Sequence, residues 1–376
     1  MKILVCSTEY PPSGSGIGNV VSNVVEHLIK RGVECTICSP AGPDIKLGNQ
    51  GLIKKFGILG LLSFWYQVSQ FFNKKNDYDV VWLQNPYFII HNPFPRCLIT
   101  MHSTYYGMSH YHVGNTFFLG MYNTIISLLE RYCLGKISKL TIFTGVGQPV
   151  CEELEKIGIA KEQIVYIPNG VNITKFHPSE NKKELRKKFK IPDDEIILLS
   201  VGRLTPQKQP FVLVDNFSII EKRIKNVSLY ISGKGELYEA TKNRVKRNNI
   251  HKIRFLGYIC DEDIPDLYAC SDYFIITSKY EGGQPPLTLA EAMASGLPCI
   301  MSDIPPHLNI IRESNCGIIV NFEDVEKTSD QIYDYLTGIH LEHSKNARKY
   351  VEKNLDWSTI SEHYFEALKR TMYLSK

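Results

Sequence analysis

Two stretches of the sequence combine residue types that could bind linked phosphates. The first begins directly after an apolar run and reads Val-Gly-Arg-Leu-Thr-Pro-Gln-Lys over residues 201–208. Arg203 supplies a planar fork of N–H donors and Lys208 a compact positive charge, a combination that suits two phosphate groups joined in one ligand. Gly202 would let the backbone approach such a ligand closely. The alternative for this stretch is a solvated basic turn.

The second stretch, residues 280–298, reads Tyr-Glu-Gly-Gly-Gln-Pro-Pro-Leu-Thr-Leu-Ala-Glu-Ala-Met-Ala-Ser-Gly-Leu-Pro. Its glycines leave backbone amides approachable, and Pro286 predicts the first position of a helix. The N-terminus of a helix binds anions readily. Glu291 would lie one to two turns into this helix, where its carboxylate could accept hydrogen bonds from two vicinal hydroxyls. The alternative for Glu291 is an acid that complements the helix dipole.

Short apolar runs alternate with helical segments along nearly the whole chain. This alternation predicts parallel sheets with helices on both faces. The helical pattern is clear at 18–31, where apolar residues recur at i, i+3, i+4 and i+7. We predict a first series of strands and then a second one, at 2–7, 33–38, 80–84, 98–101, 140–143 and 164–167, and at 195–200, 227–232, 253–256, 273–277, 299–301 and 318–320.

Two such series predict two doubly wound, Rossmann-like α/β domains in tandem, since 376 residues are more than one core usually serves. The polar stretch 178–183 separates the two series. We place the first domain at 1–177 and the second at 190–357, with a final helix at 358–376 packing back on the first domain. Ligands of such domains gather at the carboxyl ends of the strands, where both stretches described above begin.

Composition excludes several classes of protein. The net charge of +4 is too small to indicate a nucleic-acid partner. The opening residues MKILVCSTEY resemble a first strand more than a signal peptide. No apolar run reaches the ~18 residues of a spanning helix. The cysteines are scattered, and the pair Cys35 and Cys38 falls within a predicted strand. We therefore expect reduced thiols in a cytoplasmic protein.

Five motifs in a fixed order resemble the family-4 retaining glycosyltransferases of the GT-B fold. Two are the stretches already described, which match the family's "GRL-x-x-x-K" and "E-A-M-A-x-G-x-P". A third is Tyr-Pro-Pro at 10–12, followed by Gly14, Gly16 and Gly18. The others are Ile-Pro-Asn-Gly-Val-Asn at 167–172 and Phe-Leu-Gly-Tyr at 255–258. The resemblance covers nearly the whole chain and implies a GT-B architecture, with the acceptor side in the first domain and the donor in the second.

The resemblance implies roles for particular residues. Arg203 and Lys208 would hold the donor diphosphate and stabilise the leaving group. Glu291 would bind the ribose hydroxyls, and His102 would contact the transferred sugar. The resemblance assigns the remaining donor contacts to a set of glycines and neighbouring residues: Gly16 near phosphate or sugar, Tyr258 and Ile259 beside the base, and Gly202, Gly233, Gly283, Gln284, Pro285, Leu287 and Thr288.

One position departs from the family pattern. The family usually has a glutamate eight residues before the one matching Glu291, and this chain has Gly283 there. The nearest acid is Glu281, two residues earlier. Glu281 could reach the site as a catalytic residue if the following loop bulges. Alternatively, backbone amides around Gln284 could contact the sugar, and the sequence leaves this choice open.

The resemblance also implies a reaction. A hexose would pass from a nucleotide-diphosphate sugar, UDP- or GDP-linked, to a glycan or lipid-linked acceptor in cell-envelope glycan biosynthesis. The anomeric configuration would be retained, with the leaving phosphate taking the proton of the acceptor. We expect no cofactor and no metal, because Arg203 and Lys208 can neutralise the leaving group.

Two other classes of protein bind nucleotides on similar folds. A dinucleotide oxidoreductase would use the glycines at 14, 16 and 18, but its fingerprint needs glycine at position 19, which is Asn19. The second predicted strand also ends at Cys38-Ser39-Pro40 without the acid that binds ribose. A non-catalytic sugar-nucleotide-binding or regulatory GT-B protein remains the alternative.

The segment 52–66 is apolar, rich in aromatics and contains two lysines. Such a composition suits an interfacial helix on an anionic membrane, near a lipid-linked acceptor. This interpretation predicts a peripheral protein at the cytoplasmic face of the membrane. The alternative is a core helix of the first domain whose aromatic side chains pack inward.

Overall fold

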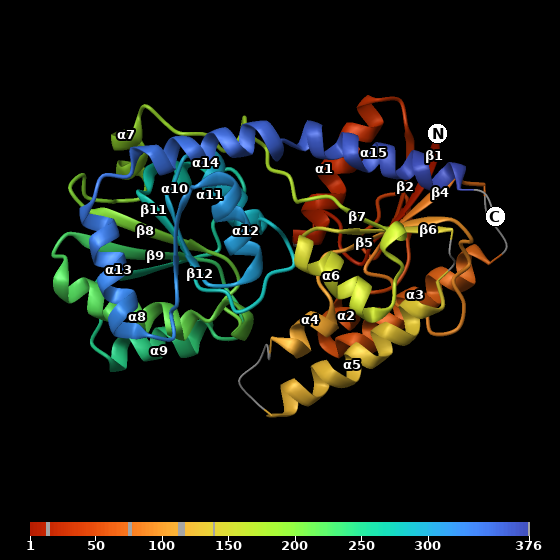
Figure 1. The fold of residues 1–376 in the computed structure, drawn as a ribbon, viewed down its shortest axis with the longest axis horizontal. Coiled ribbons are helices and arrows are strands. Elements are labelled where there is room, and N and C mark those ends of the chain that lie inside the picture. Colours follow the sequence, from red (N-terminus) through yellow and green to blue (C-terminus); the bar gives the residue numbers. More distant parts are fainter. Residues whose placement is uncertain (13–15, 74–76, 112–116, 138–139, 375–376) are drawn as a thin grey trace. The chain divides into compact units, whose positions relative to one another are not determined.

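The computed structural model describes residues 1–12, 16–73, 77–111, 117–137 and 140–374 (Figure 1). Within these ranges the chain divides into two compact units. The first contains residues 1–170 together with 357–374, and the second contains residues 171–356. Each unit is built on its own parallel sheet.

The sheet of the first unit has seven parallel strands in the order β3-β2-β1-β4-β5-β6-β7. Their bounds are β1 Lys2–Cys6, β2 Glu34–Ser39, β3 Ile45–Lys46, β4 Val80–Gln84, β5 Cys97–Met101, β6 Thr141–Gly145 and β7 Ile164–Tyr166. The helices are α1 Gly16–Lys30, α2 Gln50–Phe56, α3 Ile58–Phe72, α4 Tyr105–His110, α5 Phe117–Gly135, α6 Gln148–Ile157, the 3-10 turn η1 Lys161–Gln163 and α15 Trp357–Tyr373.

Side-chain alternation along these strands sends successive residues to opposite faces of the sheet. Leu4 and Leu83 pack in one core cluster with Trp65 of α3. Trp82 faces the other way, where its ring centroid lies 5.0 Å from that of Tyr364 in α15. The last helix therefore belongs to the core of the first unit, beside α1 (Figure 1).

The sheet of the second unit has six parallel strands in the order β10-β9-β8-β11-β12-β13. Their bounds are β8 Ile196–Val201, β9 Val227–Ser232, β10 Ile253–Gly257, β11 Tyr273–Ile276, β12 Cys299–Ser302 and β13 Gly317–Val320. The helices are α7 Lys182–Lys188, η2 Pro206–Lys208, α8 Pro210–Arg223, α9 Tyr238–Arg247, α10 Ile264–Cys270, α11 Leu287–Ala294, α12 Pro305–Ser314, α13 Val325–Thr337 and α14 Leu341–Asn354.

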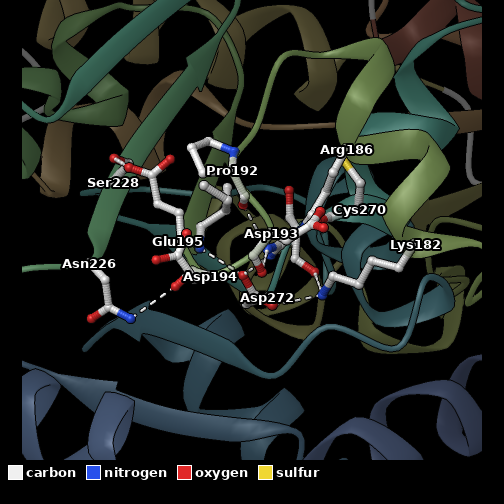
Figure 2. A network of polar contacts seen from close by, with 12 residues as sticks. Lys182, Arg186, Pro192, Asp193, Asp194, Glu195, Asn226, Ser228, Cys270 and Asp272 are labelled. Atoms are coloured by element: carbon white, nitrogen blue, oxygen red, sulfur yellow. Dashed lines mark hydrogen bonds and ion pairs between the residues drawn. The ribbon is translucent and has the colours of Figure 1, made fainter.

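A network of charges attaches α7 to this second sheet (Figure 2). Arg186 Nη2 donates to Asp272 Oδ2 at 2.6 Å and Lys182 Nζ to Asp272 Oδ1 at 2.7 Å. Asp272 also accepts from the backbone N–H of Ile197 at 2.7 Å. Asp272 and Ile197 lie at the amino ends of β11 and β8, opposite the edge where ligands gather. These ion pairs and hydrogen bonds therefore have a structural role and do not belong to a ligand site.

The predicted α/β fold class, two doubly wound parallel sheets, is confirmed by these two sheets. Each predicted strand is present, with ends that differ by at most two residues. The short strand β3 was not predicted, because two residues carry no periodic signal. Pro286 was predicted to open a helix, but it is the residue before α11, which begins at Leu287.

Candidate functional site

Two glycines let the loops that follow β8 and β9 approach each other closely. Gly202 follows β8 and donates its N–H to the carbonyl of Ser232 at 3.0 Å. Gly233 follows β9 at a φ of +129°, and a Cβ built on it would lie 2.0 Å from the carbonyl oxygen of Gly202. Any side chain at 233 would therefore push the two loops apart. The glycine keeps the backbone at this edge close and open to a ligand.

The two stretches that the sequence singled out contact each other in the second unit. Thr277 Oγ1 donates to the carbonyl of Lys208 at 2.9 Å. The backbone N–H of Lys279 donates to the carbonyl of Gln207 at 2.9 Å, and Gln207 Nε2 donates to the carbonyl of Tyr280 at 2.9 Å. These bonds fix the turn η2, and with it the backbone of Lys208, against the loop that follows β11.

Glu281 lies beside Lys208. Lys208 Nζ forms an ion pair with Glu281 Oε1, and Ser278 Oγ donates to the same oxygen. Glu281 is buried, whereas Lys208 is half-buried. Because an ammonium group has three N–H donors, Lys208 can keep this bond and still donate to a phosphate. The structure thus places Glu281 beside Lys208, and both its contact with a sugar and the contact of Lys208 with a diphosphate stay predictions.

Arg203 is exposed, and in the part of the chain that the structure describes it has no carboxylate partner. It borders a small hollow of about 30 Å³ that is also lined by Gly202, Lys208, Thr277 and Ser278. With Glu281 included, this group keeps a net charge of +1. An anion bound in the hollow would meet an arginine fork whose donors no carboxylate occupies.

Glu291 lies in α11 and is partly buried. The hydroxyl of Tyr268 lies 2.9 Å from Glu291 Oε2 and 3.1 Å from the carbonyl oxygen of Thr288. Burial raises the pKa of Glu291 to about 7, and the bond from Tyr268 only partly opposes this shift. The carboxyl group can therefore change its charge near neutral pH.

The other residues of the second unit that are predicted to contact the sugar donor lie after β10 and after β11. Tyr258 and Ile259 come directly after β10, and the Tyr258 side chain is exposed. Gln284 is buried, and its Oε1 accepts a hydrogen bond from Asn309 Nδ2 at 3.0 Å. Its neighbours form the buried loop and the first helical turn before Glu291: Gly283, Pro285, Leu287 and Thr288.

Of the two predicted residues of the first unit, His102 stands at a strand end and Gly16 at the start of a helix. His102 follows β5, and its Nε2 lies 2.8 Å from Gln84 Oε1. Burial lowers the pKa of His102 to about 3, so the imidazole is neutral at physiological pH. A neutral imidazole can exchange hydrogen bonds with a ligand but cannot act as a general acid. Gly16 opens α1, whereas Gly14 lies outside the described residues.

Three residues with roles at this site were missed by sequence reasoning: Ser278, Tyr268 and His307. His307 is fully buried, with its Nδ1 3.0 Å from the carbonyl oxygen of Ser302. Ser302 Oγ in turn donates to the carbonyl of Ser278 at 2.6 Å. A lone serine, tyrosine or histidine carries no motif, so no signal could have found them. Over the described ranges no group of three or more His, Cys, Asp or Glu side chains could hold a metal ion.

Two Rossmann-like units in tandem, with Arg203 and Lys208 at the strand ends of the second, are typical of the GT-B architecture. Comparison with known families agrees. Residues 14–175 match "Glycosyltransferase Family 4", and residues 181–354 match "Glycosyl transferases group 1". The chain belongs to family 4 of the glycosyltransferases.

Two relatives are similar to this chain in sequence, and a solved structure has the same fold. The UDP-Gal:alpha-D-GlcNAc-diphosphoundecaprenol alpha-1,3-galactosyltransferase of Escherichia coli is 30% identical over 53% of this chain and 51% of its own length. Mannosylfructose-phosphate synthase of Agrobacterium fabrum is 31% identical over 40% of this chain and 34% of its own length. The chain therefore spans about half or less of the length of these two relatives. Sucrose-phosphate synthase from Thermosynechococcus elongatus has the same fold, with a TM-score of 0.79, 20% identity and full coverage of both chains.

Proposed function

We propose that the protein is a retaining hexosyltransferase that moves a hexose from a UDP- or GDP-linked donor to a glycan or lipid-linked acceptor. The observation that carries this proposal is the position of Arg203 and Lys208 around one hollow at the end of β8, where Arg203 has no carboxylate partner among the described residues. The second unit would bind the donor and the first unit the acceptor. Family membership supports the use of a nucleotide-sugar donor.

The charges of the site suit the departure of a nucleoside diphosphate. When the bond between the sugar carbon and the β-phosphate oxygen breaks, negative charge builds on the phosphate. Arg203 can donate two hydrogen bonds to that phosphate and Lys208 at least one, and each bond strengthens as the charge grows. The phosphate oxygen would then take the proton of the attacking hydroxyl on the same face of the sugar. Attack on that face retains the anomeric configuration.

Glu281 has a supporting role in this proposal. Its carboxylate is occupied by Lys208 and by the Ser278 hydroxyl. It is therefore poorly placed to attack the sugar carbon as a nucleophile, and it would instead hold the Lys208 ammonium in position. Its remaining oxygen could accept a hydroxyl of the transferred hexose, as the resemblance implies.

Two relatives and one segment of the first unit bear on the acceptor class. The name of the E. coli relative includes a lipid-linked acceptor, whereas that of the A. fabrum relative is a sugar phosphate synthase. The segment 52–66 adds support for a lipid-linked acceptor, because Leu52, Phe56 and Leu59 are exposed. Phe64 and Trp65 of the same segment are buried, as the core alternative predicted. We propose a peripheral protein at the cytoplasmic face of a membrane.

Nucleotide binding is expected to depend on pH through Glu291. Its raised pKa of about 7 means that the protonated form prevails at about pH 6 and the carboxylate at about pH 8. Since only the carboxylate accepts hydrogen bonds from both ribose hydroxyls, UDP or GDP should bind roughly tenfold more tightly at the higher pH. Glu291→Gln removes this titration but keeps the ionisation of the nucleotide itself. Calorimetry on both proteins isolates the effect, and equal pH slopes would contradict the ribose role.

A turnover assay tests the proposed function. UDP- and GDP-hexoses are incubated with the protein, and release of the nucleoside diphosphate is followed with and without simple sugar or lipid acceptors. We expect one donor to be consumed and, by NMR of the product, the anomeric configuration to be kept. A donor that binds tightly in calorimetry but is never cleaved with any acceptor would favour the non-catalytic alternative.

A further inference from the structure

The outer face of α5 is apolar, although it faces solvent in the first unit. Met121, Ile125, Leu128 and Tyr132 recur at i, i+4, i+7 and i+11 and are 46%, 56%, 65% and 50% exposed. We call these four residues the α5 stripe. A solvent-facing helix surface normally carries polar side chains, so an apolar stripe of this length marks an interaction surface.

Contacts on the inner face fix the rotation of α5. Glu130 is fully buried and accepts hydrogen bonds from the backbone N–H groups of Tyr105 and Tyr106, both at 3.1 Å. It also accepts from the hydroxyl of Tyr87 at 3.1 Å. Turning the helix to hide the stripe would break these bonds and expose the apolar inner residues. The stripe is therefore held outward by the polar contacts behind it.

The surface continues from α5 onto neighbouring elements. A Cβ built on Gly57, between α2 and α3, would lie 3.4 Å from the Tyr122 hydroxyl of α5. At the other end of α5, Lys136 Nζ donates to the carbonyl of Ile89 at 3.0 Å. Exposed apolar side chains on these elements extend the stripe, namely Leu52, Phe56, Leu59, Tyr66, Ile89 and Ile90 (Figure 1 shows α2, α3 and α5).

The exposed charged side chains of α2, α5 and the residue after α5 have one sign. Lys54, Lys55, Arg131 and Lys136 are exposed, and α3 has no charged residue. Glu130 is the single acid in 50–72 and 117–135, and it is buried. Apolar side chains with only cations beside them complement the acyl chains and anionic headgroups of a bilayer. A second copy docked face to face would bring like charges together.

We propose that the α5 stripe, with the adjoining face of α2 and α3, docks the first unit onto an anionic membrane surface. None of the helices in the described ranges is long and apolar enough to cross a membrane, so α5 would lie in the interface plane. The proposal deepens the membrane part of the proposed function, since it moves the main contact from 52–66 to α5. It does not depend on the donor chemistry.

Vesicle flotation tests the proposal. The protein is mixed with phosphatidylcholine vesicles that contain either no phosphatidylglycerol or about 30 mol% of it. We expect binding to the anionic vesicles, and a loss of at least about tenfold in the double variant Ile125→Asp with Leu128→Asp. Arg131→Glu with Lys136→Glu should weaken binding to anionic vesicles by a similar factor.

Matched controls separate docking from misfolding and from failure of the donor site. Ile339→Asp with Leu341→Asp places the same charges on the second unit at side chains 87% and 69% exposed, and should bind vesicles like the parent. Melting temperature and UDP or GDP affinity should stay unchanged in the stripe variant. Vesicle binding unaffected by the stripe variant would overturn the proposal. So would light scattering that shows a parent dimer which the stripe variant converts to monomers.

Discussion

Replacing Lys208 by alanine is expected to lower kcat by about 10²–10³-fold, the usual effect of removing a group that stabilises charge in the transition state. Lys208 is fixed against the loop after β11, and its ammonium group can donate to a phosphate while it keeps its bond to Glu281. Its charge is needed most when the phosphate departs. The measurement is steady-state release of nucleoside diphosphate, with Lys222→Ala, at the other end of α8, as a matched control that should behave like the parent.

The same substitution removes the partner of a buried carboxylate. Lys208→Ala should therefore also lower the free energy of unfolding by about 1–3 kcal/mol. Adding Glu281→Gln should recover much of that stability, because the uncompensated charge is gone. It should not recover kcat. If the double variant regained parental turnover, Lys208 would act only by neutralising Glu281, and its role toward the leaving phosphate would be wrong.

Replacing Arg203 by alanine is expected to weaken nucleoside diphosphate binding by about 10–100-fold, which corresponds to the roughly 1.5–3 kcal/mol of a charge-assisted hydrogen bond. Because Arg203 is exposed and shares its donors with no carboxylate in the described residues, the melting temperature should barely change. Thermal shift with added UDP or GDP measures the effect. Arg203→Lys keeps the charge but loses the fork, so it should rescue only part of the affinity.

The fold could be predicted in detail from local patterns. Buried parallel strands such as Val80–Gln84 and Val227–Ser232 are short apolar runs between helical segments, so both their existence and their order follow from the sequence. Strand ends were less certain, because the last residues of a strand depend on its neighbour in the sheet. Strand β6 was predicted to end at residue 143. It extends to Gly145, because β5 pairs with it as far as that residue.

The candidate site could be predicted only as far as its motifs reach. Arg203, Lys208 and Glu291 belong to recognisable loops. The bond between Lys208 and Glu281 joins residues 73 positions apart, and no spacing rule predicts it. The support that Tyr268 gives Glu291 likewise depends on how α10 packs on α11.

Exposure was the property that sequence predicted least well. Helix α5 is apolar on nearly all sides, a composition typical of a buried helix. Segment 52–66 is rich in aromatics, yet Trp65 is fully buried while Leu59 is exposed. When a helix is apolar on two faces, its sequence does not indicate which face packs against the rest of the fold. That depends on tertiary contacts such as those of Glu130.

Calorimetric titration of a nucleoside and its diphosphate into the parent protein, Arg203→Ala and Lys208→Ala tests the account most directly. We predict that both variants lose diphosphate affinity while their affinity for the nucleoside stays that of the parent. Equal diphosphate affinity in all three proteins would contradict the assignment of the two cations to the leaving group.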